Sequence, residues 1–139
     1  MAFMGRSHPS RIKSRDGGRV PLFSQTNITV IISDMERAIK FYERTLGLKL
    51  KTRYGQEFAQ LEAPGATIAL HPSVKDGPRP GNSESLSIGF AVGDLDSAMA
   101  ELEGKGVKFT RVVDDAQVRL AFFTDPDGNP LYLSQPRWG

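Results

Sequence analysis

Cysteine is absent from this 139-residue chain, and histidine occurs only at positions 8 and 71. Without cysteine the chain has neither a disulfide framework nor thiolate ligands for a metal, and a secreted origin is disfavoured. No apolar run approaches the roughly 20 residues that a membrane-spanning helix requires, so we expect no membrane partner. With 39% hydrophobic and 24% charged residues, the composition is that of one globular domain.

Basic residues are concentrated at the start of the chain. Residues 1–23 hold five basic side chains and one acidic one, whereas the rest of the chain holds 13 basic and 15 acidic side chains. The body therefore carries a net charge of −2 without a basic stripe, and we expect no nucleic-acid partner. Residues 1–23 are interpreted as a disordered or flexible basic tail. They lack the apolar core of a secretory signal, so we expect a cytoplasmic protein. Their Arg and Ser content also fits a transit peptide for an organelle, which is the alternative.

One pattern of elements occurs twice in the chain. Residues 28–50 and 88–109 both run through a short apolar strand, an Asp, a segment of helical period and a Gly. Repetition of this kind indicates two copies of one structural module. We expect a single domain at 24–139, made of module one (26–71), a linker (72–85) and module two (86–135). The linker is rich in Pro and Gly, and it either connects the modules or folds over the cleft between them as a flap.

Each module is expected to contain four strands and one helix. The expected strands are 26–33, 48–54, 57–62 and 66–71, then 86–92, 107–113, 118–124 and 129–134. A helix is expected after Asp34 and another after Asp94, because Asp is a favourable N-cap. In the first strand Asn27 and Thr29 alternate with aliphatic residues. The aliphatic face should pack against the helices, so the other face should line a cleft between the modules.

Four motifs stand out in the chain: Asp34-Met35, Phe41-Tyr42, Leu46-Gly47-Leu48 and Phe123-Thr124-Asp125-Pro126-Asp127-Gly128-Asn129. With these motifs the chain resembles the vicinal oxygen chelate superfamily, which contains glyoxalase, bleomycin-resistance and extradiol dioxygenase proteins. The resemblance implies an α+β fold in which two βαβββ modules form a curved mixed sheet around a cleft, and it implies a homodimer. We interpret the Asp-rich tetrad at residues 125–128 as a hairpin turn, because Pro and Gly suit turn positions.

The resemblance also implies where a metal would bind. Metal-dependent members hold one divalent ion with four side chains, and the matching positions here are Asn27, Ala69, Ser87 and Tyr132. None of these side chains is a carboxylate or an imidazole, and Ala69 has no donor atom. Without the ion, the chain would also lack the Lewis acid on which the chemistry of the metal-dependent members depends. We therefore predict no metal and no cofactor.

Two functions remain open. The first is binding of a small, partly aromatic organic molecule in the cleft between the modules, without a metal. The predicted ligand-binding residues are Asn27, Thr29, Ala69, Ser87, Arg119 and Tyr132. Arg119 would contact an anionic group, although an ordinary exposed Arg on a sheet is the alternative. Trp138 would cover the cleft or meet a partner chain, or it would simply be exposed.

The second function is an enzyme of the same superfamily, a lyase, isomerase or oxygenase. It would use a displaced metal, or metal-free acid–base catalysis with His71 as the general base, because the ordinary pKa of histidine lies near neutral pH. The other role for His71 is a hydrogen bond at the cleft wall. Alternation along the strand also places Phe58, Gln60 and Glu62 on one face, although a shift of register by one residue would move them to the other face.

Overall fold

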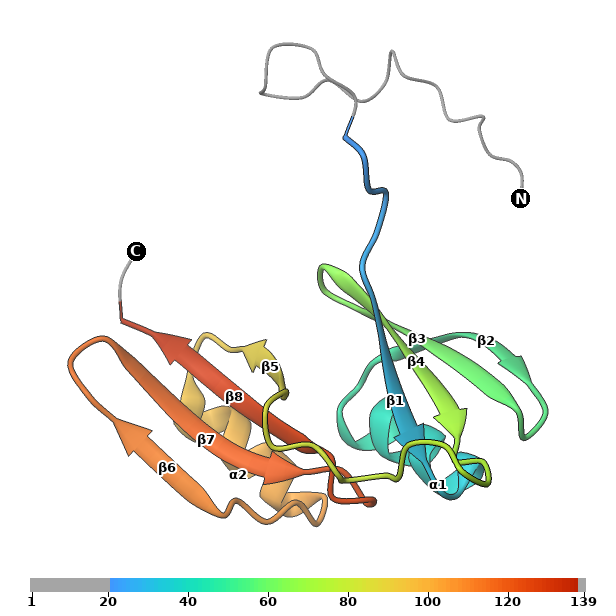
Figure 1. Cartoon of the computed structure of the whole chain (residues 1–139). Helices are drawn as coiled ribbons and strands as arrows, with labels where there is room; N and C mark the ends of the chain where they lie inside the picture. Colours follow the sequence, from blue (N-terminus) through green and yellow to red (C-terminus); the bar gives the residue numbers. More distant parts are fainter. Residues whose placement is uncertain (1–20, 138–139) are drawn as a thin grey trace.

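The computed structural model describes residues 21–137, which form two similar halves (Figure 1). Each half contains a four-stranded mixed sheet with a helix against one face. The predicted tail lies outside the described residues except for positions 21–23, and His8 and Trp138 also lie outside them. Within residues 21–137, no helix has the length and apolar character needed to cross a membrane.

Module one contains the first four strands. Its elements are β1 (Asn27–Ile32), α1 (Met35–Ile39), the π-helical segment η3 (Lys40–Thr45), β2 (Lys49–Tyr54), β3 (Phe58–Ala63) and β4 (Ala66–Pro72). The strands lie in the order β1-β4-β3-β2, with β1 parallel to β4 and the other neighbours antiparallel. Strand β1 is therefore an edge strand, because it pairs with a neighbour on one side only.

Module two repeats this arrangement. Its elements are β5 (Ile88–Ala91), α2 (Leu95–Gly104), β6 (Arg111–Asp114), β7 (Val118–Thr124) and β8 (Pro130–Pro136). The order β5-β8-β7-β6 matches that of module one, and β5 is again a parallel edge strand. The predicted fold class, two βαβββ modules, is confirmed. The described strands form two separate sheets rather than one continuous sheet, because β1 and β5 are not hydrogen-bonded to each other.

Strand alternation divides each sheet into a buried face and an open face. Ile32, Ile68 and Leu70 are fully buried and pack on the helical side of module one. The opposite face carries Asn27 beside Thr67 and Thr29 beside Ala69, as expected. Gln60 pairs with Ala69 across β3 and β4, so the predicted grouping of Phe58, Gln60 and Glu62 lies on this open face.

Most strand boundaries lie within two residues of the predicted ones, but the first helix and one strand differ further. The first helix changes after Ile39 into π-helical turns, in which the Leu46 backbone N–H donates to the carbonyl of Phe41, five residues earlier. The strand predicted from residue 107 begins only at Arg111. Val107 instead donates its backbone N–H to the carbonyl of Leu102 and closes the end of α2, so its apolar side chain is buried without belonging to a strand.

Candidate functional site

A cavity of about 540 Å³ lies between the two edge strands β1 and β5. Three segments form its walls: β1, the end of the connection between the modules with the start of β5, and the start of β8. The lining residues are Asn27, Ile28, Thr29, Val30, Ile31, Pro78, Arg79, Asn82, Ser83, Leu86, Ser87, Ile88, Asn129 and Pro130. The lining therefore mixes aliphatic groups with amides and hydroxyls, and the connecting segment contributes its middle and its end to the wall.

Three of the predicted ligand-binding residues line this cavity. Asn27 and Thr29 lie on the open face of β1, and Ser87 directly precedes β5. All three are exposed, so their polar groups are accessible. The Asn27 side-chain oxygen accepts a hydrogen bond of 2.6 Å from the Gln25 side-chain nitrogen. Asn27 and Ser87 therefore hold matching positions in the repeat and face the same cavity.

The other predicted site residues are not among the lining residues. Ala69 is buried beside Thr29 in β4. His71 is exposed at the end of β4, where its Nδ1 lies 2.8 Å from the carbonyl oxygen of Pro72. Arg119 faces α2, because its guanidinium pairs with Asp96 of that helix and with Asp114, at 3.1 and 3.2 Å.

Tyr132 belongs to a row of side chains that crosses the open face of module two. The strand register aligns Gly89, Tyr132, Phe122 and Arg111 across β5, β8, β7 and β6. A Cβ atom at Gly89 would overlap the Tyr132 ring, so the ring lies directly over this glycine. The Phe122 and Tyr132 ring centroids are 6.0 Å apart, and the Arg111 guanidinium lies 4.8 Å from the centroid of Phe122. This aromatic row lies beside the row of Ser87 and Pro130, which lines the cavity.

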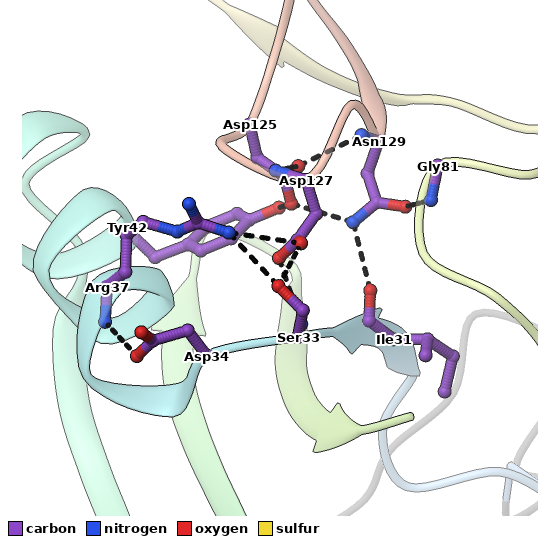
Figure 2. A network of polar contacts seen from close by, with 9 residues as sticks. All are labelled: Ile31, Ser33, Asp34, Arg37, Tyr42, Gly81, Asp125, Asp127 and Asn129. Carbon is purple, nitrogen blue, oxygen red and sulfur yellow. Dashed lines mark hydrogen bonds and ion pairs between the residues drawn. The ribbon is translucent and has the colours of Figure 1, made fainter. Parts of the chain in front are cut away.

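A network of polar contacts joins module one to the hairpin turn of module two (Figure 2). The buried Tyr42 hydroxyl donates to Asp125 Oδ2 at 2.8 Å, and Asp125 is itself only 3% exposed. Burial, together with the negative charge of Asp125, raises the pKa of Tyr42 far above its usual range. Asp127 accepts from the Ser33 hydroxyl at 2.5 Å and from Arg37 at 3.3 Å. The Asp-rich tetrad thus acts as a turn that holds the modules together.

Asn129 connects this joint to the cavity wall. Its side-chain nitrogen donates to the carbonyl oxygen of Ile31 at 3.1 Å and to Asp125 at 2.8 Å (Figure 2). Its side-chain oxygen accepts from the backbone N–H of Gly81 at 2.8 Å. Asn129 therefore joins strand β1, the β7–β8 turn and the connection between the modules. All three of these segments contribute to the cavity.

Comparisons with known proteins give the family. The model of the Glyoxalase/Bleomycin resistance protein/Dioxygenase superfamily matches residues 24–133. The chain belongs to this superfamily. A protein of Mycolicibacterium smegmatis is 36% identical over 110 residues, which cover 78% of this chain and 90% of that one.

Two further proteins are similar to this chain. The crystal structure of TnmS3, an antibiotic binding protein from Streptomyces sp. CB03234, aligns with a TM-score of 0.67 at 30% identity and covers 85% of this chain and 99% of that one. A lactoylglutathione lyase of Schizosaccharomyces pombe is 30% identical over 132 residues. That match covers 73% of this chain but only 44% of the lyase.

The positions that superfamily membership suggests for a metal do not fit one in this chain. Ala69 is buried and has no donor atom, while the Tyr132 hydroxyl lies against Gly89. Within residues 21–137, no group of three or more His, Cys, Asp or Glu residues is placed to hold an ion. Asn27 and Ser87 offer only neutral oxygens and nitrogen, which bind divalent ions weakly against water.

Sequence reasoning missed the residues that the connection between the modules brings to the cavity. Pro78, Arg79, Asn82 and Ser83 line it, although their segment has no period that would assign them to a face. The run Pro78-Arg79-Pro80-Gly81 is nevertheless a signal of a rigid turn. Gly81 has a φ of +72°, and a Cβ atom there would lie 2.5 Å from the carbonyl oxygen of Asp127. The glycine therefore permits close contact between this segment and the β7–β8 turn.

Proposed function

We propose that this chain binds a small, partly aromatic organic molecule in the cavity between the two modules, without a metal. The cavity itself carries the proposal. Its volume of about 540 Å³ lies within the roughly 300–1,000 Å³ typical of small-molecule sites. Aliphatic side chains would contact the body of the ligand, and Asn27, Thr29 and Ser87 would orient it through hydrogen bonds.

The aromatic row beside the cavity supports a ligand with a planar part. Tyr132 and Phe122 are half-buried on the open face of module two, next to the row that contains Ser87. A ring that extends from the cavity along this face would stack on them, which is favourable for aromatic pairs. The likeness to TnmS3 points in the same direction, since that protein binds an antibiotic.

An enzyme with His71 as the general base is the second candidate, and it rests on the likeness to the lactoylglutathione lyase. A general base must lie within hydrogen-bond reach of the proton that it removes. His71 lies outside the cavity lining, so it would serve a ligand bound elsewhere. For this reason we place binding first.

Two matched variants test the proposed site. A thermal-shift screen of organic metabolites and antibiotics would first identify stabilising compounds, whose affinities would then be measured by calorimetry. Ser87→Phe fills the cavity and should lower the affinity at least tenfold. Ser85→Phe adds the same ring in the same segment, outside the lining, and should leave the affinity unchanged. Equal affinities for the two variants would refute the site.

The same preparation separates binding from the enzymatic alternative. Elemental analysis should find no stoichiometric metal, and a chelator should change neither the melting temperature nor the affinity. A bound ion whose removal destabilises the fold would support the enzyme instead. So would chemical turnover of a bound compound that His71→Ala abolishes.

A further inference from the structure

Arg79 is the single charged side chain among the residues that line the cavity. In the described part of the chain, no carboxylate lies within ion-pair distance of its guanidinium, whereas Arg37 and Arg53 each pair with one and Arg119 pairs with two. No Asp or Glu lines the cavity to oppose the positive charge. On the basis of the proposed function, we infer that the ligand is an organic acid whose carboxylate binds Arg79.

The backbone at Arg79 is held in place before any ligand arrives. Prolines precede and follow Arg79, and each proline ring restricts its own φ and the conformation of the residue before it. Two residues further on, the backbone N–H of Gly81 donates a hydrogen bond to the side-chain oxygen of Asn129. The backbone N–H of Asn82 donates to the carbonyl oxygen of Arg79 at 3.4 Å. Binding therefore orders only the side chain of Arg79, which favours affinity.

The distribution of groups in the cavity matches a molecule with one charged end. Asn82, Ser83 and Ser87 line the cavity from the same segment as Arg79, so this segment supplies amide and hydroxyl donors as well as the cation. Strand β1 also lines the cavity, and its Ile31 lies on the same strand face as Asn27 and Thr29. A guanidinium matches the two oxygens of a carboxylate and forms charge-assisted hydrogen bonds with them. The carboxylate would thus lie at the connecting segment and the apolar body against β1.

The magnitude follows from the exposure of the arginine. Arg79 is exposed, so water and salt screen its charge, and the ion pair is worth less than a buried one. A charge-assisted hydrogen bond in this setting is expected to favour a carboxylate over a neutral group of the same shape by about tenfold. That difference should shrink as ionic strength rises, because salt screens an exposed ion pair.

Matched pairs of compounds test the inference. Each pair consists of an aromatic carboxylic acid and its primary amide, with bodies that range from one ring to fused tricycles. Their affinities for the wild-type chain are measured by calorimetry at neutral pH in low salt. The acids should bind about tenfold more tightly than their amides. Arg79→Gln should abolish this preference, because it weakens the acids more than the amides, and Arg79→Lys should retain part of it.

Arg44→Gln is the control, because Arg44 is also exposed but does not line the cavity. It should preserve the preference for acids. Amides that bind as tightly as acids, at a site that Ser87→Phe blocks, would overturn the inference and leave the proposed function intact. A preference for acids that persists in Arg79→Gln, or that Arg44→Gln reduces equally, would also overturn it. Failure of every pair to bind would overturn the inference and count against the proposed site.

Discussion

Replacing Tyr42 by phenylalanine removes one hydroxyl from the buried joint between the modules. This hydroxyl donates to Asp125 at 2.8 Å, and the Tyr42 side chain is fully buried. A hydrogen bond to a charged group contributes about 1.5–3 kcal/mol. Asp125 would keep three donors, which are the backbone N–H groups of Asp127 and Asn129 and the side-chain nitrogen of Asn129. We therefore expect Tyr42→Phe to lower the free energy of unfolding by about 1.5–2 kcal/mol, measured by urea denaturation.

Two comparison variants show whether the hydrogen bond causes that loss. Asp125→Ala leaves the Tyr42 hydroxyl and the other donors without their acceptor, so it should cost about 3–5 kcal/mol. Tyr54→Phe removes a hydroxyl from a side chain that is 65% exposed and should change stability by less than about 0.5 kcal/mol. The reasoning fails if Tyr42→Phe is as stable as Tyr54→Phe, or as unstable as Asp125→Ala.

The pH dependence of unfolding gives a second measurement on Tyr42. Its pKa is raised in the folded protein by burial and by the charge of Asp125, so the unfolded chain loses this proton at a lower pH than the folded one. The stabilisation is fully present below about pH 10 and is lost above it, with a slope of about 1.4 kcal/mol per pH unit. Tyr42→Phe should remove this part of the alkaline slope. An unchanged slope would mean that the hydroxyl is not held as a buried donor.

Two glycines give further predictions. Gly81→Ala should lower the free energy of unfolding by about 1–3 kcal/mol, because it places a side chain at a φ of +72° and against Asp127. At Gly93 an added Cβ atom meets no neighbouring atom, so Gly93→Ala should be nearly neutral. Urea unfolding of both variants compares them. Gly89→Ala should displace the Tyr132 ring at a cost of about 1–3 kcal/mol, and adding Tyr132→Ala should recover part of that loss in a double-mutant cycle. Additive effects of the two substitutions would contradict the contact.

The repeat and the strand alternation predicted two copies of one module and the order of its elements, and the family resemblance predicted the fold that they form. The period of two in β1 separated Asn27 and Thr29 from the buried Ile32, and the matching position in module two identified Ser87. These inferences depend only on local pattern, because a strand with one buried face must alternate. Residues at the starts of the two edge strands could therefore be assigned to the cavity from sequence.

The remaining features depend on contacts that local pattern does not contain. The face of Arg119 follows from the register of β7 with its neighbours and from the carboxylates of Asp96 and Asp114 nearby. Arg79 lies in a segment without hydrophobic period, and its place at the cavity follows from the bond between Gly81 and Asn129, 48 positions apart. Such pairings could not be read from either segment alone.

Two of the motifs that carry the family resemblance, Phe41-Tyr42 and the run from Phe123 to Asn129, meet at the joint between the modules. The Tyr42 hydroxyl, in η3, donates a hydrogen bond to Asp125, and the Asn129 side-chain nitrogen donates one to the carbonyl oxygen of Ile31 (Figure 2). These contacts fix how β1 lies against module two, so they predict architecture without specifying a ligand. Most of the cavity wall comes from residues outside those motifs, Arg79 among them. Substitutions at Arg79 should therefore change what binds while the fold persists, whereas loss of the Tyr42 bond should weaken the frame on which any binding depends.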